Sequence, residues 1–386
     1  MVNQTIKNSI DIWVNPAKTF TFIKGRVALY AILRSIGVGP GDEVLIPGFT
    51  CVVVPAAICY TGAKPIFYDI NPNTYNGEPK EACNKVTKKT KAIMIQHTFG
   101  VPADCGDILD ICQKNGIYLI EDCAHAIGAS KNTQPVGTIG DAAFCSLQWS
   151  KLVTSGLGGI ALSQNSNITA RLKEIYIEQF KEPSIYKTTY LRILSHFYRN
   201  YFDSKLYWPA QKTYRWAGCH GLIQGSSSRQ ELQNSVIPKN YCERFGKARL
   251  KSLYRMLKTL PENLLHRQRI ANLYRNHLIE YGYKLQHLDR NNINVPLRFP
   301  LLVKHRDSLL RAARKRRIEI GDWFNAPLHP NSCNAKRFGY RKGECPITEF
   351  TARHIINLPT HINISDKVAF RIMEFLNERE HLFIRE

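Results

Sequence analysis

Two patterns of apolar positions alternate along the first 165 residues. Short runs of consecutive apolar residues are typical of strands buried on both faces, and apolar residues spaced three or four apart are typical of helices packed on them. The predicted strands are 43–47, 65–69, 91–96, 117–121, 141–146 and 159–163. The predicted helices are 26–36, 51–60 and 104–115. This order indicates an α/β fold with a mostly parallel sheet between helices.

The pattern changes after residue 184. Apolar and aromatic residues then recur at helical spacing among Lys and Arg, at Tyr190, Leu194, Phe197 and Tyr201. A stretch rich in Gly and Ser, 216–235, is typical of a loop, and 245–281 predicts one or two long helices. The last hundred residues alternate shorter strands and helices.

These changes predict two domains. We expect a large domain over 1–240, with a basic aromatic insertion at about 184–235. We expect a smaller C-terminal α/β domain over 241–386. A length of 386 residues agrees with this division, since domains commonly have about 150 residues.

The cysteines and the apolar runs exclude several classes of protein. There are 11 cysteines, an odd number, at irregular spacings and without a C-x-x-C pair. This favours reduced thiols in a cytoplasmic protein over a disulfide framework or a zinc site, so we expect no bound metal. No run of about 18 apolar residues predicts a membrane span, and residues 1–20 lack the apolar centre of a secretory signal.

The net charge of +22 is unevenly distributed. Residues 184–260 contain 14 Lys and Arg against Asp203, Glu231 and Glu243, which is half of the surplus. This predicts one basic face. Within it, 186–208 could be a helix lying on an anionic membrane at the inner face, or an insertion that packs on a dimer partner, and we favour the second. Nucleic-acid binding is disfavoured because no binding motif accompanies the charge.

The segments EDCAHAIGA, 121–129, and GDAAFCSLQWSK, 140–151, carry the candidate chemistry. Asp122 follows a buried strand, at the edge where open α/β sheets bind ligands, and Lys151 lies 29 residues further on. A lysine that forms a Schiff base needs a rigid position and a readily lost proton. An aspartate paired with a pyridine nitrogen keeps that nitrogen protonated. Alone, such an acid is usually a turn or cap residue and such a lysine is solvated, but their order and spacing favour bound pyridoxal phosphate (PLP).

Several ordered motifs resemble the DegT–DnrJ–StrS family of sugar aminotransferases, which has the type I aspartate-aminotransferase fold. E-D-x-A-[QH]-A-x-G-A matches 121–129, G-D-x-x-x-x-S-x-x-x-x-K matches 140–151, and H-x-x-G-x-P-A-D matches 97–104. The helix start G-x-x-A-L resembles 25–29, and the P-L-H and L-P-x-H segments resemble 327–329 and 358–361. The resemblance is strong over residues 20–165 and weak over 185–260.

The resemblance implies a role for individual residues. Lys151 would be the Schiff-base lysine and the general acid and base. The predicted contacts of the cofactor are Asp122 at the pyridine nitrogen, His125 beside the ring or its phenolic oxygen, and Ser146, Gly25 and Arg26 at the phosphate. The predicted substrate contacts are His329, with Lys239 and Asn240 supplied by a neighbouring subunit. Family members are homodimers with shared active sites, so we expect the same here.

Two positions depart from the family pattern. Where many members have Ser-Gly-Thr, this chain has Lys24-Gly25-Arg26, so a hydroxyl is replaced by a guanidinium. Where many have an aromatic residue that stacks on the cofactor, the aligned residue is Cys51. Stacking would then fall to Phe49 or to no aromatic residue.

The resemblance implies an aminotransferase that moves an amino group, from a donor such as glutamate, to a keto-sugar on a nucleotide diphosphate. Such reactions serve amino-sugar, lipopolysaccharide and other cell-surface polysaccharide biosynthesis. One alternative is sugar deoxygenation or dehydration, but relatives that dehydrate sugars have histidine in place of the lysine, and Lys151 speaks against it. The other is a non-catalytic sensing relative, which the Asp122 and Lys151 pair disfavours.

Overall fold

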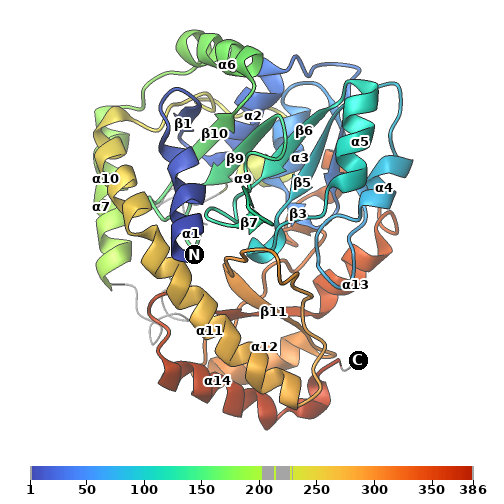
Figure 1. Cartoon of the computed structure of the whole chain (residues 1–386), viewed down its shortest axis with the longest axis vertical. Coiled ribbons are helices and arrows are strands. Elements are labelled where there is room, and N and C mark those ends of the chain that lie inside the picture. Colours follow the sequence, from blue (N-terminus) through green and yellow to red (C-terminus); the bar gives the residue numbers. More distant parts are fainter. Residues whose placement is uncertain (1, 202–212, 214–226, 228, 385–386) are drawn as a thin grey trace.

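The computed structural model describes residues 2–201, 213, 227 and 229–384. A large sheet with helices on both sides forms the upper part of the molecule in Figure 1, and a small two-stranded sheet with its own helices forms the lower part. Helix α11 (Leu260–Glu280) runs from one part to the other. The predicted α/β class is therefore confirmed.

The large sheet has seven strands in the order β1-β10-β9-β6-β5-β2-β4. Strands β4, β2, β5, β6 and β9 are parallel, whereas β10 is antiparallel to β9 and β1 is antiparallel to β10. The strands are β1 (Thr19–Phe22), β2 (Glu43–Pro47), β4 (Lys64–Tyr68), β5 (Thr90–Gln96), β6 (Tyr118–Asp122), β9 (Ala142–Ser146) and β10 (Gly159–Ser163). All six strands predicted for this half are present, within one residue at each end, because each is a continuous apolar run.

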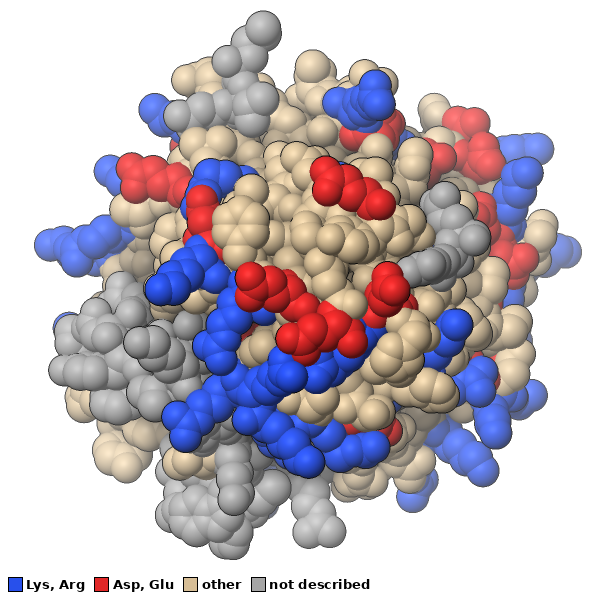
Figure 2. Space-filling view, turned by 90° about the horizontal axis from the view of Figure 1, so that it is seen from below, with Lys and Arg blue, Asp and Glu red and all other residues tan. Residues whose placement is uncertain are grey.

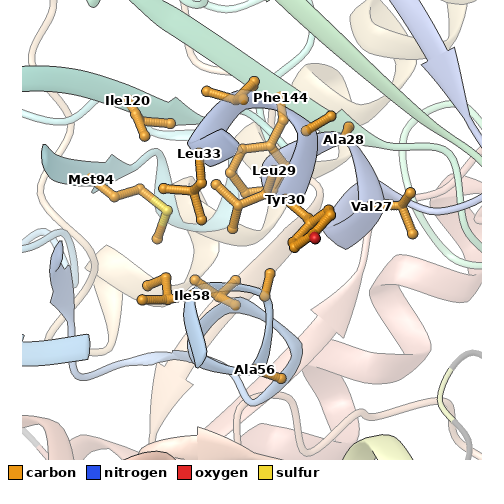
Figure 3. Packing of buried hydrophobic residues seen from close by; sticks show 14 of the residues in the cluster. Val27, Ala28, Leu29, Tyr30, Leu33, Ala56, Ile58, Met94, Ile120 and Phe144 are labelled. Carbon is orange, nitrogen blue, oxygen red and sulfur yellow. The ribbon is translucent and has the colours of Figure 1, made fainter. Parts of the chain in front are cut away.

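Successive strand residues enter different hydrophobic cores. In β2, Val44 and Ile46 join the core beneath α2 and α3, and Leu45 joins the core on the opposite face. Figure 3 shows the first core, where Leu29 and Leu33 of α2 lie among Ile58, Met94 and other residues of α3 and the sheet. The helices that cover the sheet are α1 (Val2–Asp11), α2 (Gly25–Ser35), α3 (Val53–Cys59), α4 (Pro79–Asn84), α5 (Gly106–Asn115), α6 (Ser166–Gln179) and α10 (Lys247–Lys258).

The lower part has a separate core. Strands β11 (Arg298–Leu302) and β13 (Ile355–Pro359) pair antiparallel, and α12 (Arg306–Lys315), α13 (Pro346–His354) and α14 (Asp366–Asn377) belong to the same half of the chain. Helix α11 contributes to both cores: Leu260 and Leu264 pack towards the large sheet, and Ile270 and Tyr274 pack with the small one. Residues 245–281, predicted as one or two long helices, form two helices, α10 and α11. The boundary near residue 240 stays a prediction.

The insertion is partly helical. Helix α7 (Ile185–Tyr201) confirms the helical spacing, while residues 202–208 and the side chains of 196–201 lie outside what the structure describes. The stretch 216–235 is not all loop, because Arg229–Gln233 forms helix α9. A buried Glu231 with two cationic partners anchors this helix, and such a long-range contact leaves no local sequence signal.

Basic side chains also gather outside the insertion. Figure 2 shows a belt of Lys and Arg, next to several acidic groups, across the lower face of the molecule. Helix α12 ends in exposed Arg314 and Lys315, and Arg316 and Arg317 follow. The described helices include none with both the length and the apolar composition needed to cross a membrane.

Candidate active site

The carboxyl ends of two neighbouring strands place the predicted catalytic residues together. Asp122 is the last residue of β6, and Ser146 is the last residue of the adjacent parallel β9. Lys151 lies in the turn between β9 and β10. Backbone hydrogen bonds close this turn, from Leu147 N–H to Gly158 O at 2.9 Å and from Lys151 N–H to Gln148 O at 3.1 Å. Lys151 is therefore held at the edge where parallel α/β sheets bind ligands.

The Asp122 carboxylate is buried with little compensation. Its side chain accepts one hydrogen bond within the described chain, from Ala124 N–H at 2.9 Å. Burial raises the pKa of this carboxyl group, and the nearby Lys151 opposes the rise. A buried carboxylate with one hydrogen bond is costly, and a cationic partner would relieve the cost.

Lys151 is buried beneath an aromatic ring. Its Nζ lies 4.3 Å from the centre of the Trp323 ring, a cation–π distance. Burial lowers the pKa of Lys151 to about 8, Asp122 opposes that effect, and Arg298 adds to it. An amine with this pKa is partly neutral near pH 7 to 8 and can act as a nucleophile or base.

His125 lies in an aromatic pocket next to these groups. Its ring stacks against Phe99 and Phe324, with centres 6.1 and 5.7 Å away, and lies 5.1 Å from Trp323. Burial lowers its pKa well below the usual value, and Lys151 acts in the same direction. Nδ1 accepts a hydrogen bond from Phe99 N–H at 3.2 Å, which leaves the ring proton of neutral His125 on Nε2.

The start of helix α2 lies directly beside Ser146. A Cβ atom on Gly25 would be 2.9 Å from Cβ of Ser146, so the close approach requires glycine. Gly159 of β10 has the same constraint, because its Cβ would be 2.5 Å from the Gly25 backbone. The first turn of a helix presents free N–H groups and a positive dipole end, which favour an anion such as phosphate.

Arg26, predicted at the phosphate, is engaged with an acid from the insertion. Its Nη1 lies 2.8 Å from Glu231 Oε1, and Lys24 Nζ lies 3.1 Å from Glu231 Oε2. All three side chains are largely buried. Burial, and then the neighbouring Arg26, lower the pKa of Lys24 to about 8. Arg26 thus lies at the correct end of α2, while its contact with a phosphate stays a prediction.

Of the predicted substrate residues, His329 lies near Lys151 in this chain, whereas Lys239 and Asn240 do not. His329, in the short strand β12 (Leu328–His329), pairs in register with Cys51 of β3 (Thr50–Cys51), and its ring centre lies 5.9 Å from that of Trp323. The structure therefore brings His329 to the site. Lys239 and Asn240 lie exposed in the turn before Tyr241, and they do not line the Lys151 cavity of this single chain. Their predicted role requires a partner chain and stays a prediction.

The position predicted for cofactor stacking holds no aromatic residue. Cys51 is half-buried, and burial raises its pKa while the nearby Arg26 and Lys151 lower it. Phe49 is fully buried, with its ring centre 5.2 Å from Phe324. Both alternatives for stacking therefore stay open.

Three residues of the site carry no signal in the sequence. Trp323 contacts Lys151, and Phe324 stacks against His125. Arg298 lowers the pKa of Lys151. All three lie at least 147 residues after Lys151 in the chain. Lys151 and Arg298 share a cavity of about 410 Å³ with Glu319 and His361 from the lower part of the molecule. Sequence reasoning missed Trp323, Phe324 and Arg298 because they come from segments without a recognisable motif, whereas His361 lies in the L-P-x-H segment.

A buried cluster of His97, Glu121 and Cys123 lies on the other side of β6. Two of its three members are used in hydrogen bonds: His97 Nε2 lies 3.0 Å from Glu121, and His97 Nδ1 accepts from Ala103 N–H at 2.9 Å. The Glu121 carboxylate also accepts from three backbone N–H groups of the loop 137–140. Through these hydrogen bonds, Glu121 and His97 hold the loop 137–140 in place, which is a structural role.

Comparison with known families identifies the chain. The sequence model of the DegT/DnrJ/EryC1/StrS aminotransferase family matches residues 13–191 and 250–377. The chain belongs to this family. The unmatched stretch between the two parts, 192–249, contains most of the basic insertion and α9. Membership makes the protein a PLP-dependent aminotransferase of the sugar-aminotransferase group.

Individual family members agree. The chain is 27% identical over 359 residues to UDP-N-acetyl-3-dehydro-alpha-D-glucosamine 3-aminotransferase of Acidithiobacillus ferrooxidans, covering 92% of this chain and 83% of that protein. It is 40% identical over 148 residues to GDP-perosamine synthase of Vibrio cholerae, covering 38% of this chain and 40% of that protein. The aminotransferase from Psychrobacter cryohalolentis has the same fold, with a TM-score of 0.74 at 17% identity over 98% of this chain and 90% of that one.

The residues at the sheet edge of this aminotransferase fit PLP. The buried carboxylate of Asp122 accepts one hydrogen bond from the described residues and has Lys151 nearby, and a protonated pyridine nitrogen would supply a direct cationic partner. Lys151 offers an amine of lowered pKa, and the start of α2 beside Ser146 offers helix N–H groups to a phosphate. When bound, PLP supplies an electron sink for the carbon that gains or loses the amino group.

Proposed function

We propose that this aminotransferase moves the amino group of an amino-acid donor, glutamate, to a keto-sugar carried on a nucleotide diphosphate. The observation that carries the proposal is the pairing of buried Asp122 with buried Lys151 at the sheet edge, beside a cavity of about 410 Å³. Such a pair has little use in a purely structural site, since each group is costly to bury charged.

Each residue has a distinct part in the proposed reaction. Asp122 would hold the proton on the pyridine nitrogen, since its carboxylate accepts one hydrogen bond from the described residues. Lys151 Nζ would bind the cofactor aldehyde and would carry a proton to and from the substrate carbon. His125 would donate its Nε2 proton to the cofactor, because its Nδ1 already accepts from Phe99 N–H. Ser146 and the start of α2, at Gly25 and Arg26, would bind the phosphate.

A nucleotide-linked substrate is supported by the relatives and by the local charge. Two relatives are named for a UDP-linked and a GDP-linked sugar. The cavity of Lys151 contains Arg267 and Arg298, whose positive charge favours anionic groups. His329, next to Trp323, would contact the sugar. Amino-sugar formation for lipopolysaccharide or another cell-surface polysaccharide is the pathway type that such a reaction serves.

We further propose that the protein is a cytoplasmic homodimer with shared active sites. Lys239 and Asn240 are exposed in one chain, which suits residues that reach a neighbour's phosphate site. Helix α7 exposes Ile185, Tyr186 and Ile193, and this supports either a partner contact or a peripheral contact with the inner membrane. The partner contact is preferred because α7 belongs to the same insertion as Glu231, which reaches the start of α2.

The test is a two-stage reaction with the purified protein. In the first stage, glutamate should change the visible absorbance of the bound cofactor. In the second, keto-sugars linked to UDP, GDP, dTDP and CMP should restore that absorbance, and the sugar that does so fastest identifies the substrate. A protein that binds the cofactor but never responds to an amino acid would be a binding relative, and one that responds only with loss of sugar oxygen would be a dehydrase.

A further inference from the structure

Two neighbouring helices, α7 and α10, carry positive charge without any acidic residue. Their sequences contain three and five Lys or Arg, respectively, and no Asp or Glu. The two helices pack beside each other at the left edge of Figure 1. Like charges at close range repel, and neither helix offers a carboxylate that would offset the repulsion. An anion bound between the helices would stabilise this arrangement.

A groove of about 710 Å³ lies between the two helices. Its described lining contains no Asp or Glu, and its cationic members are Arg192, Arg249, Lys251 and Arg255. Hydroxyl groups accompany these cations, from Ser155, Thr189, Ser195 and Ser252. The groove therefore offers charge-assisted hydrogen bonds to an anion and no group that would repel one.

The acids that flank the two helices in the chain are paired elsewhere. Glu182, ahead of α7, lies 3.7 Å from Arg244, and Glu243, ahead of α10, pairs with Lys187 on α7. Within the described part of the chain, no acid forms an ion pair with the exposed side chains of the groove, which are Arg192, Lys251 and Arg255. Their charge is therefore open to a ligand.

Arg249 is the buried cation of the groove. Its side chain is 3% exposed, and its guanidinium carbon lies 4.0 Å from the centre of the Phe245 ring. It donates to the backbone oxygens of Phe245 at 3.1 Å and Ser155 at 2.8 Å, and also to that of Leu157. These bonds use three of the five N–H donors of a guanidinium. Burial lowers the pKa of Arg249 to about 10, and a nearby anion would offset that cost.

The groove adjoins the cavity of Lys151 without being part of it. Met256 lines both. Thr154 lines the Lys151 cavity, and the next residue, Ser155, lines the groove and accepts the hydrogen bond from Arg249. A ligand in the groove would therefore lie beside the turn between β9 and β10 that holds Lys151.

Part of the groove belongs to the segment that distinguishes this chain from the family model. Arg192 and Arg249 are the first and last residues of the unmatched stretch 192–249. The groove is therefore built where the insertion leaves and rejoins the part of the chain that the family model matches. The excess of positive charge in residues 184–260 has a structural location here, between α7 and α10.

We propose that the groove between α7 and α10 binds a diphosphate group, of the kind that a nucleoside diphosphate carries. Lys251 and Arg255 are four residues apart in α10 and lie on the same side of the helix, one turn apart, which suits two linked phosphates. Arg192 adds a cation from α7. A single carboxylate would leave most of this charge unmatched. A bilayer surface is flat, whereas these cations line a hollow.

Two ligands carry this chemistry. One is the acceptor sugar nucleotide, whose diphosphate would extend from the Lys151 cavity into the groove, and the other is a free nucleoside diphosphate. The inference goes beyond the proposed function, because diphosphate binding requires no transamination.

The test measures binding of inorganic pyrophosphate and of UDP by calorimetry, with the full-length, cofactor-loaded protein. Lys251→Gln/Arg255→Gln should weaken pyrophosphate binding about 10- to 30-fold, because each exposed charge contact contributes up to about fivefold. Arg192→Gln should weaken it by up to about fivefold from the opposite helix. The control Arg314→Gln/Lys315→Gln removes the same charge from the exposed last turn of α12 and should leave the affinity within about twofold. Denaturant melts check the fold of each variant.

The kinetics of the same variants identify the source of the diphosphate. If it belongs to the acceptor, Lys251→Gln/Arg255→Gln should raise KM for the keto-sugar nucleotide about tenfold and leave the glutamate response of the cofactor unchanged. If KM is unchanged while UDP binding is weakened, the ligand is a separate nucleoside diphosphate. A protein that ignores every amino acid but binds pyrophosphate in the groove would contradict the proposed function alone.

Three results would overturn the diphosphate site itself. The first is a wild type that binds neither pyrophosphate nor UDP at millimolar concentration. The second is equal pyrophosphate affinity in the groove variant and the α12 control. The third is binding to phosphatidylglycerol vesicles that the groove variant loses, without binding of either soluble diphosphate, which would make the groove part of a membrane contact.

Discussion

The two faces of β6 hold neighbouring carboxylates in contrasting environments. Glu121 is fully buried and accepts hydrogen bonds from Gly137, Ile139 and Gly140 N–H at 2.7–2.8 Å, and it also lies 3.0 Å from His97. Asp122, one residue later and on the opposite face, is almost as buried but accepts one hydrogen bond from the described residues. Alternation along a strand makes the difference possible, since consecutive side chains point to opposite faces.

The difference shows that two almost equally buried carboxylates can have different uses, according to how many hydrogen bonds each one accepts. A carboxylate with all its hydrogen bonds satisfied contributes stability by fixing a loop, here 137–140 ahead of β9. A carboxylate left partly unsatisfied costs stability and keeps an affinity for a cation. The cofactor side of the sheet therefore holds the strained groups, Asp122 and Lys151, and the other side holds the supports.

The largest expected effect is on the cofactor side. Lys151→Ala should lower turnover by about 10⁴-fold or more, because the chain loses the amine that binds the aldehyde and moves the proton. The fold should persist, since the variant removes a buried amine of lowered pKa. Turnover and borohydride reduction check this prediction, and cofactor fixed covalently to the variant by borohydride would contradict it.

Asp122→Asn should lower turnover by about 10²- to 10³-fold while cofactor still binds. An amide cannot keep the pyridine nitrogen protonated, but it removes a carboxylate whose pKa burial has raised, so unfolding should need at least as much denaturant as in the wild type. Kinetics and denaturant melts on the same preparation provide both values. Near-normal turnover would remove Asp122 from the site.

Glu121→Gln is the matched change on the supporting face and should show the reverse pattern. It should lower the free energy of unfolding by about 2–4 kcal/mol, because an amide cannot accept all four of the bonds that the carboxylate accepts. Turnover per folded molecule should change only a few-fold. A stable but inactive Glu121→Gln would erase the contrast between the two faces.

The smallest effect is a pH dependence of cofactor attachment. With a pKa of about 8 for Lys151, the neutral amine should increase about tenfold per pH unit below 8 and level off above it. The rate at which apo-protein forms the absorbing complex with PLP should follow that curve. A rate that kept rising to pH 10 would indicate an exposed lysine of ordinary pKa.

Regular elements with a strong local pattern were predictable. Continuous apolar runs located the six predicted strands, and the motif spacing located Asp122, His125, Ser146 and Lys151, which the structure gathers at one sheet edge. Helix α9 was predicted as loop because its formation depends on Glu231 reaching Lys24 and Arg26, about 205 residues away in the chain.

The sequence by itself determined the family and the sheet and predicted the catalytic pair, because the spacing of apolar residues and of motif residues is a local property that can be recognised without the fold. Only the tertiary structure decided what surrounds that pair. Trp323 contacts Lys151, and Arg298 contacts Trp323, because β11 and the segment before β12 return to the sheet edge. Glu231 contacts Arg26 because α9 lies next to the start of α2. Contacts between distant segments depend on packing, and no single window of sequence records them.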